Sequence, residues 1–266
     1  MPPMITRKAL GLMLLGGSCM LGCSGDPETA AAEPKTEIAS AAILDLRDVA
    51  AKPDPYAWFD FRPNIKKLIL TGAAETQHIA ILWYTVADGG VALHYHAKTE
   101  SVYVIEGTQA DAKGTYDTGT VYFNPPGSGH QVTDSSGFFL LAYAAPPDFA
   151  ATELIDEAYT PVRIDTTDPE LTTTYAFEEQ SAGASVFEPS LDAGGGLAAS
   201  FIELKGTDRY DFVGNYFLAL DGACVVEEVK VTAAHLVVGE DIEPRSYAVA
   251  AADGGSCLGL GVAFRD

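Results

Sequence analysis

The chain has 266 residues, 47% of them hydrophobic, and its 37 acidic side chains against 16 basic ones give a formal charge of −21. This length supplies one large β domain or two small ones. The charge repels nucleic acid and anionic lipid headgroups, so neither is expected as a partner of the folded part.

The chain begins with a segment typical of export. Residues 1–22 combine a basic start, an apolar run of about a dozen residues and small residues before a cysteine, which predicts a signal peptide rather than a membrane span. The sequence "MLGC" that ends at Cys23 resembles a bacterial lipoprotein box, which implies that Cys23 is lipidated. Ser24 after it favours the outer membrane, facing the periplasm. The alternatives are ordinary cleavage with a free Cys23, or cleavage at Cys19.

Residues 23–42 are small, polar and proline-containing, which predicts a disordered tether. From residue 43 onward, short runs rich in Val, Ile, Tyr, Phe and Thr alternate with Gly, Asp and Pro, as in "HIAILWYTV", "SVYVIEG" and "GFFLLAYAA". A short helix is expected only at "FAATELIDEAY". Many short strands at regular spacing predict an all-β sandwich or barrel of the jelly-roll kind.

The two halves of this β region resemble each other. "SVYVIEGT" and "YFLALDGA" are both apolar strands that end in an acidic residue and glycine, and "GFFLLAY" corresponds to "GSCLGLG" in the same order. We therefore predict a duplicated domain, with a first barrel over residues 43–150, a linker over 151–175 and a second barrel over 176–266.

Two cysteines remain in the folded part, Cys224 and Cys257. In an oxidising periplasm they are candidates for a disulfide, which would stabilise the fold by roughly 3–4 kcal/mol if the strands bring them close. The alternative is two separate buried thiols.

The stretch "HYHAKTE" carries the clearest chemical signal. His94 and His96 lie two residues apart and project from the same face of a strand, and Glu100 follows at an even spacing. His130 follows the turn "PPGSG". Imidazoles and a carboxylate are ligands of first-row divalent metals, so these four residues predict one metal site.

These residues also carry a family resemblance. "HYHAKTESVYVIEG" is similar to the first cupin motif, His-x-His, three residues, Glu, six residues and Gly, and "GTVYFNPPGSGH" is similar to the second. The glycine expected before the first histidine is displaced to Gly89 and Gly90, and Asp134 stands where the second motif ends in Asn. The motifs cover about 45 residues. The whole chain resembles a bicupin, and its layout resembles a bacterial cupin family of the domain-of-unknown-function type.

The resemblance implies tandem cupin barrels, each a double-stranded β-helix, with one divalent metal ion in the first. His94, His96, Glu100 and His130 would hold the ion, Fe or Mn being favoured and Zn or Ni being alternatives. One or two positions would stay open for water, dioxygen or a chelating substrate. The resemblance also allows a homodimer formed through the sheets.

The second half departs from the motif. If Gly222 corresponds to Gly107, the ligand positions are occupied by Arg209, Asp211, Asn215 and, near the last one, Tyr247. These side chains cannot form a metal cage. We expect this half to be structural, a degenerate C-terminal cupin.

Two functional hypotheses remain. The first is a metal-dependent enzyme of the dioxygenase, decarboxylase, isomerase or lyase type that acts on a small oxygen-rich substrate, with Glu106 as a candidate general base. The second is a membrane-tethered module that binds a metal or small ligand without turnover. An ionisable side chain pointing inward, within about 5 Å of the open metal position, would favour acid–base catalysis. A cavity without acids would favour binding, or chemistry driven by the metal alone.

Overall fold

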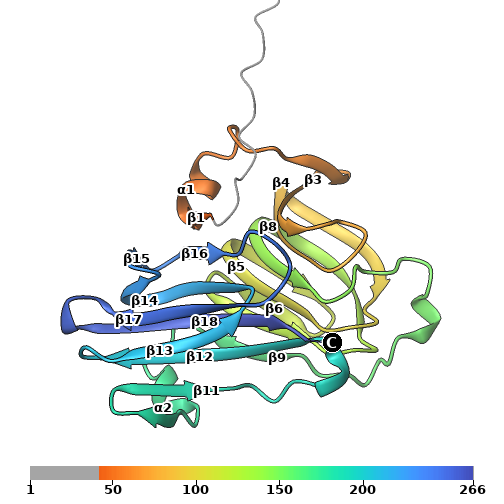
Figure 1. The fold of residues 1–266 in the computed structure, drawn as a ribbon. Coiled ribbons are helices and arrows are strands. Elements are labelled where there is room, and N and C mark those ends of the chain that lie inside the picture. The colour runs from red at the N-terminus through yellow and green to blue at the C-terminus, as the bar shows by residue number, and fades with distance from the viewer. Residues whose placement is uncertain (1–41, 266) are drawn as a thin grey trace, which may run out of the picture. The chain divides into compact units, whose positions relative to one another are not determined.

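The computed structural model describes residues 42–265, which belong to one compact unit. The predicted signal peptide, Cys23 and the tether up to residue 41 lie outside the described residues. Within residues 42–265, no helix has the length and hydropathy that a membrane span needs. Most of this part is built from two antiparallel sheets, drawn in Figure 1 from orange to green and, apart from the short strand β1, from teal to blue.

The first sheet is formed by the N-terminal half. Its strands are β2 (Phe59–Arg62), β3 (Ile65–Gly72), β4 (His78–Tyr95), β5 (Glu100–Asp111), β6 (Gly114–Asp117), β7 (Thr120–Asn124), β8 (Gly129–Tyr143) and β9 (Val162–Asp165). Their order is β2-β3-β4-β8-β5-β7-β9, and β6 pairs with β5.

The second sheet contains the remaining strands, which are β1 (Ile43–Asp45), β10 (Glu178–Ser181), β11 (Ala184–Phe187), β12 (Leu197–Lys205), β13 (Arg209–Gly214), β14 (Tyr216–Val226), β15 (Val229–Thr232), β16 (His235–Val238), β17 (Arg245–Ala251) and β18 (Ser256–Phe264). The helices are short: α1 (Leu46–Ala51), α2 (Leu171–Thr174) and the 3-10 turns η1 (Thr152–Leu154), η2 (Ala193–Gly195) and η3 (Ala252–Gly254).

The predicted repeat of the two halves corresponds to a repeat in the structure. Strand β5 pairs with β8, and β14 pairs with β18 in the same antiparallel sense. Both β5 and β14 contain a bulge just before their acidic-Gly pair. Gly107 and Gly222 have φ of +91° and +70°, and a Cβ there would lie 2.0 Å from the Ser136 carbonyl oxygen and 2.3 Å from that of Ser256. Only glycine fits such a position.

The strand pairing crosses the predicted domain boundaries in two places. Strand β1, at the start of the predicted first barrel, pairs with β16 of the second sheet, Ile43 opposite Val237. Strand β9, inside the predicted linker, pairs with β7 of the first sheet, Val121 opposite Ile164. Each segment covers a strand that would otherwise present unpaired backbone groups.

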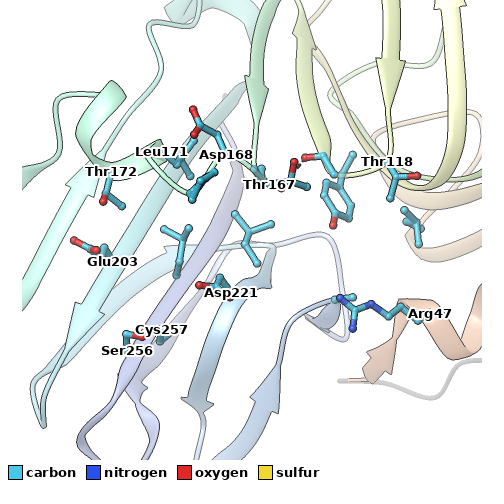
Figure 2. A pocket seen from close by; sticks show the side chains of 18 residues that line it. Arg47, Thr118, Thr167, Asp168, Leu171, Thr172, Glu203, Asp221, Ser256 and Cys257 are labelled. Atoms are coloured by element: carbon cyan, nitrogen blue, oxygen red, sulfur yellow. Dashed lines mark hydrogen bonds between the residues drawn. The ribbon is translucent and has the colours of Figure 1, made fainter.

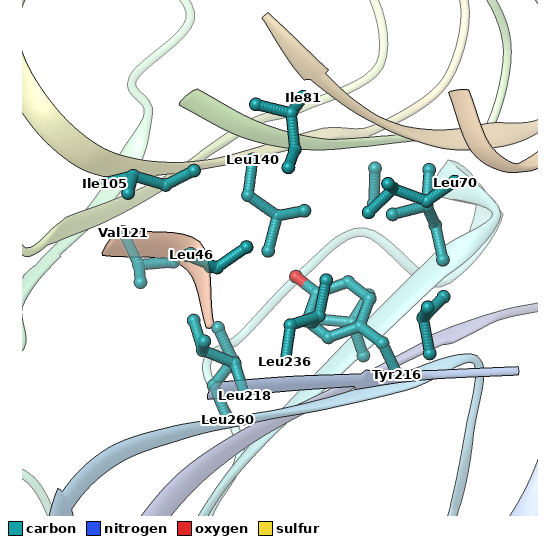
Figure 3. Close-up of a cluster of buried hydrophobic side chains, with 14 of the residues drawn as sticks. Leu46, Leu70, Ile81, Ile105, Val121, Leu140, Tyr216, Leu218, Leu236 and Leu260 are labelled. Atoms are coloured by element: carbon teal, nitrogen blue, oxygen red, sulfur yellow. The ribbon is translucent and has the colours of Figure 1, made fainter. Parts of the chain in front are cut away.

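The outer faces of the two sheets pack against each other. Along β8, Phe139, Leu141 and Tyr143 belong to the core inside the first barrel, whereas Leu140 and Ala142 belong to the core between the sheets, as the two-residue period of a strand requires. Figure 3 shows Leu140 facing the second sheet among the aliphatic side chains of both halves. The first barrel therefore keeps an interior of its own.

The second barrel is filled by apolar side chains. Phe217, Val249 and Tyr247 are buried in its core, which also contains Cys224 and Cys257. The structure joins these two cysteines in a disulfide, with their Cα atoms 5.0 Å apart. This interior has no group of metal-ligating side chains among its core residues.

Candidate metal centre

Three histidines meet inside the first barrel because two strands pair at their ends. His94 near the end of β4 lies opposite His130 at the start of β8, and His96 follows β4 directly. The turn before His130 is tied to His96 by two backbone hydrogen bonds of 2.8 Å, from the His96 N–H to the Ser128 carbonyl and from the Gly127 N–H to the His96 carbonyl. The three ligand nitrogens lie within 4.8 Å of one another, and all three side chains are buried.

Glu100, the first residue of β5, completes the group. Its Oε2 lies 3.4 Å from His96 Nε2 and 3.7 Å from His130 Nε2. The Asn124 side-chain amide donates a 2.8 Å hydrogen bond to the same oxygen, and the Tyr143 hydroxyl donates another to the carboxylate. The structure thus brings together all four residues that the sequence predicts as ligands.

Hydrogen bonds orient two of the imidazoles. His94 Nδ1 lies 2.8 Å from the Ala92 carbonyl oxygen, and His130 Nδ1 lies 2.7 Å from Asp111 Oδ2. In the neutral tautomer that these acceptors require, each Nδ1–H donates and each Nε2 keeps a free lone pair. Neither ring nitrogen of His96 has a hydrogen-bond partner, although both are buried. A metal ion among the three rings would give His96 the missing partner, so these residues fit a metal ion.

The electrostatics of the site keep His94 and His96 neutral. Burial, together with the neighbouring His96 and His130, lowers the pKa of His94 to about 3. Burial and His130 also lower the pKa of His96 well below its ordinary value. Metal ligation requires the neutral imidazole, so these rings are in the binding form at pH 7.

Comparison with known proteins agrees with this geometry. Residues 46–146 match the family described as ChrR Cupin-like domain. This match covers 101 of the 266 residues and includes all four predicted ligands. No curated protein matches the chain.

Solved structures extend the likeness to more than four fifths of the chain. A Leptotrichia buccalis cupin 2 conserved barrel domain protein is 9% identical with a TM-score of 0.54, covering 86% of this chain and 99% of that one. A candidate dioxygenase from Nostoc punctiforme is 11% identical with a TM-score of 0.53, covering 84% and 82%. A Bacillus subtilis oxalate decarboxylase mutant is 12% identical at a TM-score of 0.47, covering 88% and 79%. At such identities the likeness shows the fold alone. The Leptotrichia buccalis protein, with its TM-score above 0.5, supports the predicted cupin fold, and the two sheets described above give the predicted tandem arrangement.

The cupin barrel leaves a small cavity beside the histidines. It has a volume of about 20 Å³ and is lined by His94, Glu100 and His130 together with Tyr84, Gln109, Tyr143, Phe61 and Phe149. This space accommodates roughly one water molecule. Phe149 covers the site, its ring centroid 5.2 Å from that of His94. The adjacent Asp148 is held to Tyr95 by backbone hydrogen bonds of 2.8 and 2.9 Å in both directions.

Glu106 does not join this site. Its side chain is exposed and it is absent from the lining of the cavity. Val102 and Val104 point into the cupin barrel, but the bulge between Val104 and Glu106 interrupts the alternation of the strand. The condition for an acid–base role, a side chain pointing inward near the metal position, is therefore not met by Glu106.

The corresponding positions of the second cupin barrel are used differently. Arg209 and Asp211 are exposed and contact each other at 3.4 Å. Asn215 is buried; its amide donates to the Ile242 carbonyl, and its Oδ1 accepts from the Phe264 N–H at 2.7 Å. Tyr247 is buried and donates to the Asn215 carbonyl at 2.8 Å. Two of these four side chains are thus bonded to backbone groups in the interior, and the other two lie at the surface.

A larger cavity of about 470 Å³ lies between the two sheets (Figure 2). Its charged lining consists of Arg47 on one side and Asp168, Glu203 and Asp221, while Cys257 belongs to the disulfide. No histidine lines it. The buried cavity beside His94 and Glu100 is therefore the better candidate for metal chemistry.

Proposed function

We propose that the N-terminal cupin barrel binds one divalent transition metal ion through His94, His96, Glu100 and His130. The observation that carries this proposal is the set of three buried imidazole nitrogens within 4.8 Å of one another, beside a carboxylate and with His96 otherwise unpartnered. Four protein ligands leave one or two positions on an ion that accepts five or six. This donor set suits Fe or Mn, with Zn or Ni as alternatives.

We further propose that the site is enzymatic and acts on a small oxygen-rich substrate. A bound ion would supply Lewis-acid or redox chemistry at its open positions. The protein would supply orientation, because Asn124 and Tyr143 hold Glu100, and the aromatic wall that contains Phe61 and Phe149 would exclude water. The cavity has no carboxylate besides Glu100. This favours chemistry driven by the metal, as in a dioxygenase, over a reaction that needs a separate carboxylate base.

A second candidate function is a binding module without turnover. The size of the cavity favours it, since about 20 Å³ admits roughly one water molecule and no larger substrate unless the cap at Phe149 moves. Oxygen consumption and product formation in a screen of small carboxylates, enols and diols would separate the two, because a binding module would show affinity and no turnover.

The metal proposal is tested by elemental analysis of the soluble chain that begins after Cys23. We expect close to one Fe, Mn, Ni or Zn per chain, and a thermal midpoint that rises with added divalent ions. A protein that purifies empty and gains no stability from any of these ions would contradict it.

Asp111 should matter for metal affinity although it is not a ligand. Its carboxylate accepts the His130 Nδ1–H at 2.7 Å and so fixes the tautomer and orientation of that ring. We expect Asp111→Ala to weaken metal binding by about 10–100-fold, measured by competition with a chelator. Asp117→Ala, an exposed residue of β6 on the same hairpin, is the control and should leave the affinity unchanged. Equal affinities in the two variants would contradict the role of Asp111.

We propose that the protein reaches the periplasm and is anchored to the outer membrane through lipidated Cys23. The support is the signal-like segment 1–22 and the "MLGC" sequence. In the native host, Cys23→Ser should abolish labelling by a radioactive or clickable fatty acid and move the protein from the membrane to the soluble fraction. Labelling that persists in the variant would contradict the assignment.

A further inference from the structure

Lys67 is a buried cation in the wall of the first cupin barrel. Lys67 belongs to β3 and is only 1% exposed, and its Nζ lies 3.0 Å from His78 Nε2. His78 Nδ1 lies 2.7 Å from the Thr76 carbonyl oxygen and donates to it, so Nε2 carries the lone pair that accepts from Lys67. Burial lowers the pKa of His78 to about 4, which keeps this acceptor neutral.

No carboxylate pairs with Lys67 in the part of the chain that the structure describes. Burial lowers the pKa of Lys67 to about 8, so the ammonium form still predominates at pH 7. Glu100 is the carboxylate whose charge raises the Lys67 pKa against the larger effect of burial, but the two groups form no ion pair, and a buried charge without a directly paired counter-ion destabilises a fold. Packing alone does not explain why the fold keeps this charge, whereas a negatively charged ligand close to Lys67 would.

The position of Lys67 links it to the metal cavity. Its Nζ lies 4.3 Å from the centroid of the Phe61 ring and 4.9 Å from that of Tyr143. Both rings line the cavity, and the Tyr143 hydroxyl donates to Glu100. One layer of aromatic rings thus separates the ammonium from the cavity, with little water between them to screen its charge.

A second cation lies at the cap. The Arg62 guanidinium carbon is 4.6 Å from the Phe61 centroid and 4.2 Å from the Phe149 centroid. The acidic groups nearby are already engaged, Glu100 as a proposed ligand and Asp111 by the His130 Nδ1–H. With a divalent ion bound, the charges around the cavity sum to a positive value, although the chain as a whole carries −21.

We infer that the ligand of this metal site is a small carboxylate anion, which the positive potential of Lys67 and Arg62 selects over a neutral molecule of the same shape. This inference rests on the proposed metal site and names the substrate class of that site. Since the cavity of about 20 Å³ holds roughly one water molecule, even the smallest carboxylate, formate, would enter only when the cap at Phe149 moves.

The test compares formate with formamide, which have nearly the same shape and differ in charge. Both are titrated calorimetrically into metal-loaded wild-type protein and into Lys67→Met. Lys67→Met removes a positive charge that one layer of aromatic rings separates from the cavity. The Kd for formate should therefore rise at least about tenfold, and the Kd for formamide should change little. Lys66→Met is the matched control, because the neighbouring Lys66 Nζ contacts Asp60 at 3.0 Å on the outside. It should bind formate as the wild type does.

Each outcome has a defined meaning. Formate affinity that is equal in wild type and Lys67→Met, or wild-type protein that binds formamide as tightly as formate, overturns the inference and leaves the metal site intact. If Lys67→Met does not fold, as judged by circular dichroism, two other results test the inference. The wild type should bind formate more tightly than formamide, and Arg62→Gln should reduce this preference by about threefold. Elemental analysis of the same samples shows separately whether the metal proposal itself fails.

Discussion

The His94→Ala/His96→Ala double variant should purify without metal, with less than about 0.1 ion per chain where the wild type holds about one. The variant removes two of the three nitrogens that lie within 4.8 Å of one another, and Glu100 and His130 alone make a weak two-ligand site. Both proteins should be dialysed against the same metal-depleted buffer before elemental analysis.

Stability provides a second readout of the same variant. A ligand that binds only the folded state stabilises it by about 2.7 kcal/mol at a hundredfold excess over its Kd. The wild type should gain this stability with its metal, and the double variant should gain none. His235→Ala is the control, because the Nδ1 of His235, on β16 of the second sheet, lies 3.0 Å from the Thr232 carbonyl oxygen and takes no part in the histidine cluster. A double variant that keeps the metal content of the wild type would contradict the proposed ligand set.

Much of the metal site could be predicted because its information is local. The two-residue period of a strand places His94 and His96 on one face, and the Pro-Gly turn before His130 announces a new strand. The acidic-Gly pairs of the two halves were likewise visible in the sequence. They coincide with bulges at Gly107 and Gly222, where a side chain would collide with the neighbouring strand. Such positions restrict the residue type strongly, so they leave a trace in the sequence.

The residues that orient the ligands could not be predicted in the same way. Asn124 and Tyr143 both lie opposite Glu100, one on β7 and the other on β8, and only the register of those strands brings them there. Asp111 reaches His130 from the far end of β5. Nothing in the local sequence around these residues distinguishes them from other polar or core positions, because the contacts depend on long-range pairing.

The prediction for Glu106 relied on local spacing alone, and a bulge in the strand makes such spacing misleading. Counting by twos along β5 from Glu100 places Glu106 on the ligand face, but the bulge after Val104 shifts the alternation and leaves the side chain exposed. The predicted domain boundaries have a similar limit. Strand β1 covers an edge of the second sheet by pairing with β16, and strand β9 covers an edge of the first by pairing with β7. Their short sequences do not specify which sheet they join.

Asn215→Ala should destabilise the protein by about 3–6 kcal/mol, more than most single substitutions. Asn215 precedes Gly222 by seven residues, as Glu100 precedes Gly107, so it occupies the ligand position of the second barrel. Its side chain joins the Ile242 carbonyl to the Phe264 N–H, and truncation would leave both backbone groups buried without a partner, at about 1–3 kcal/mol each, besides a small cavity.

Urea unfolding of the metal-free soluble chain measures this effect, with Asp211→Ala as the control. Asp211 is exposed at another former ligand position, so its replacement should change the free energy of unfolding by less than about 0.5 kcal/mol. If Asn215→Ala proved as mild as Asp211→Ala, the amide would have no structural role. A large effect at Asn215 alone would mean that the second barrel retains a polar residue at the ligand position because that residue connects two buried backbone groups. The same position would then serve metal chemistry in one barrel and folding in the other.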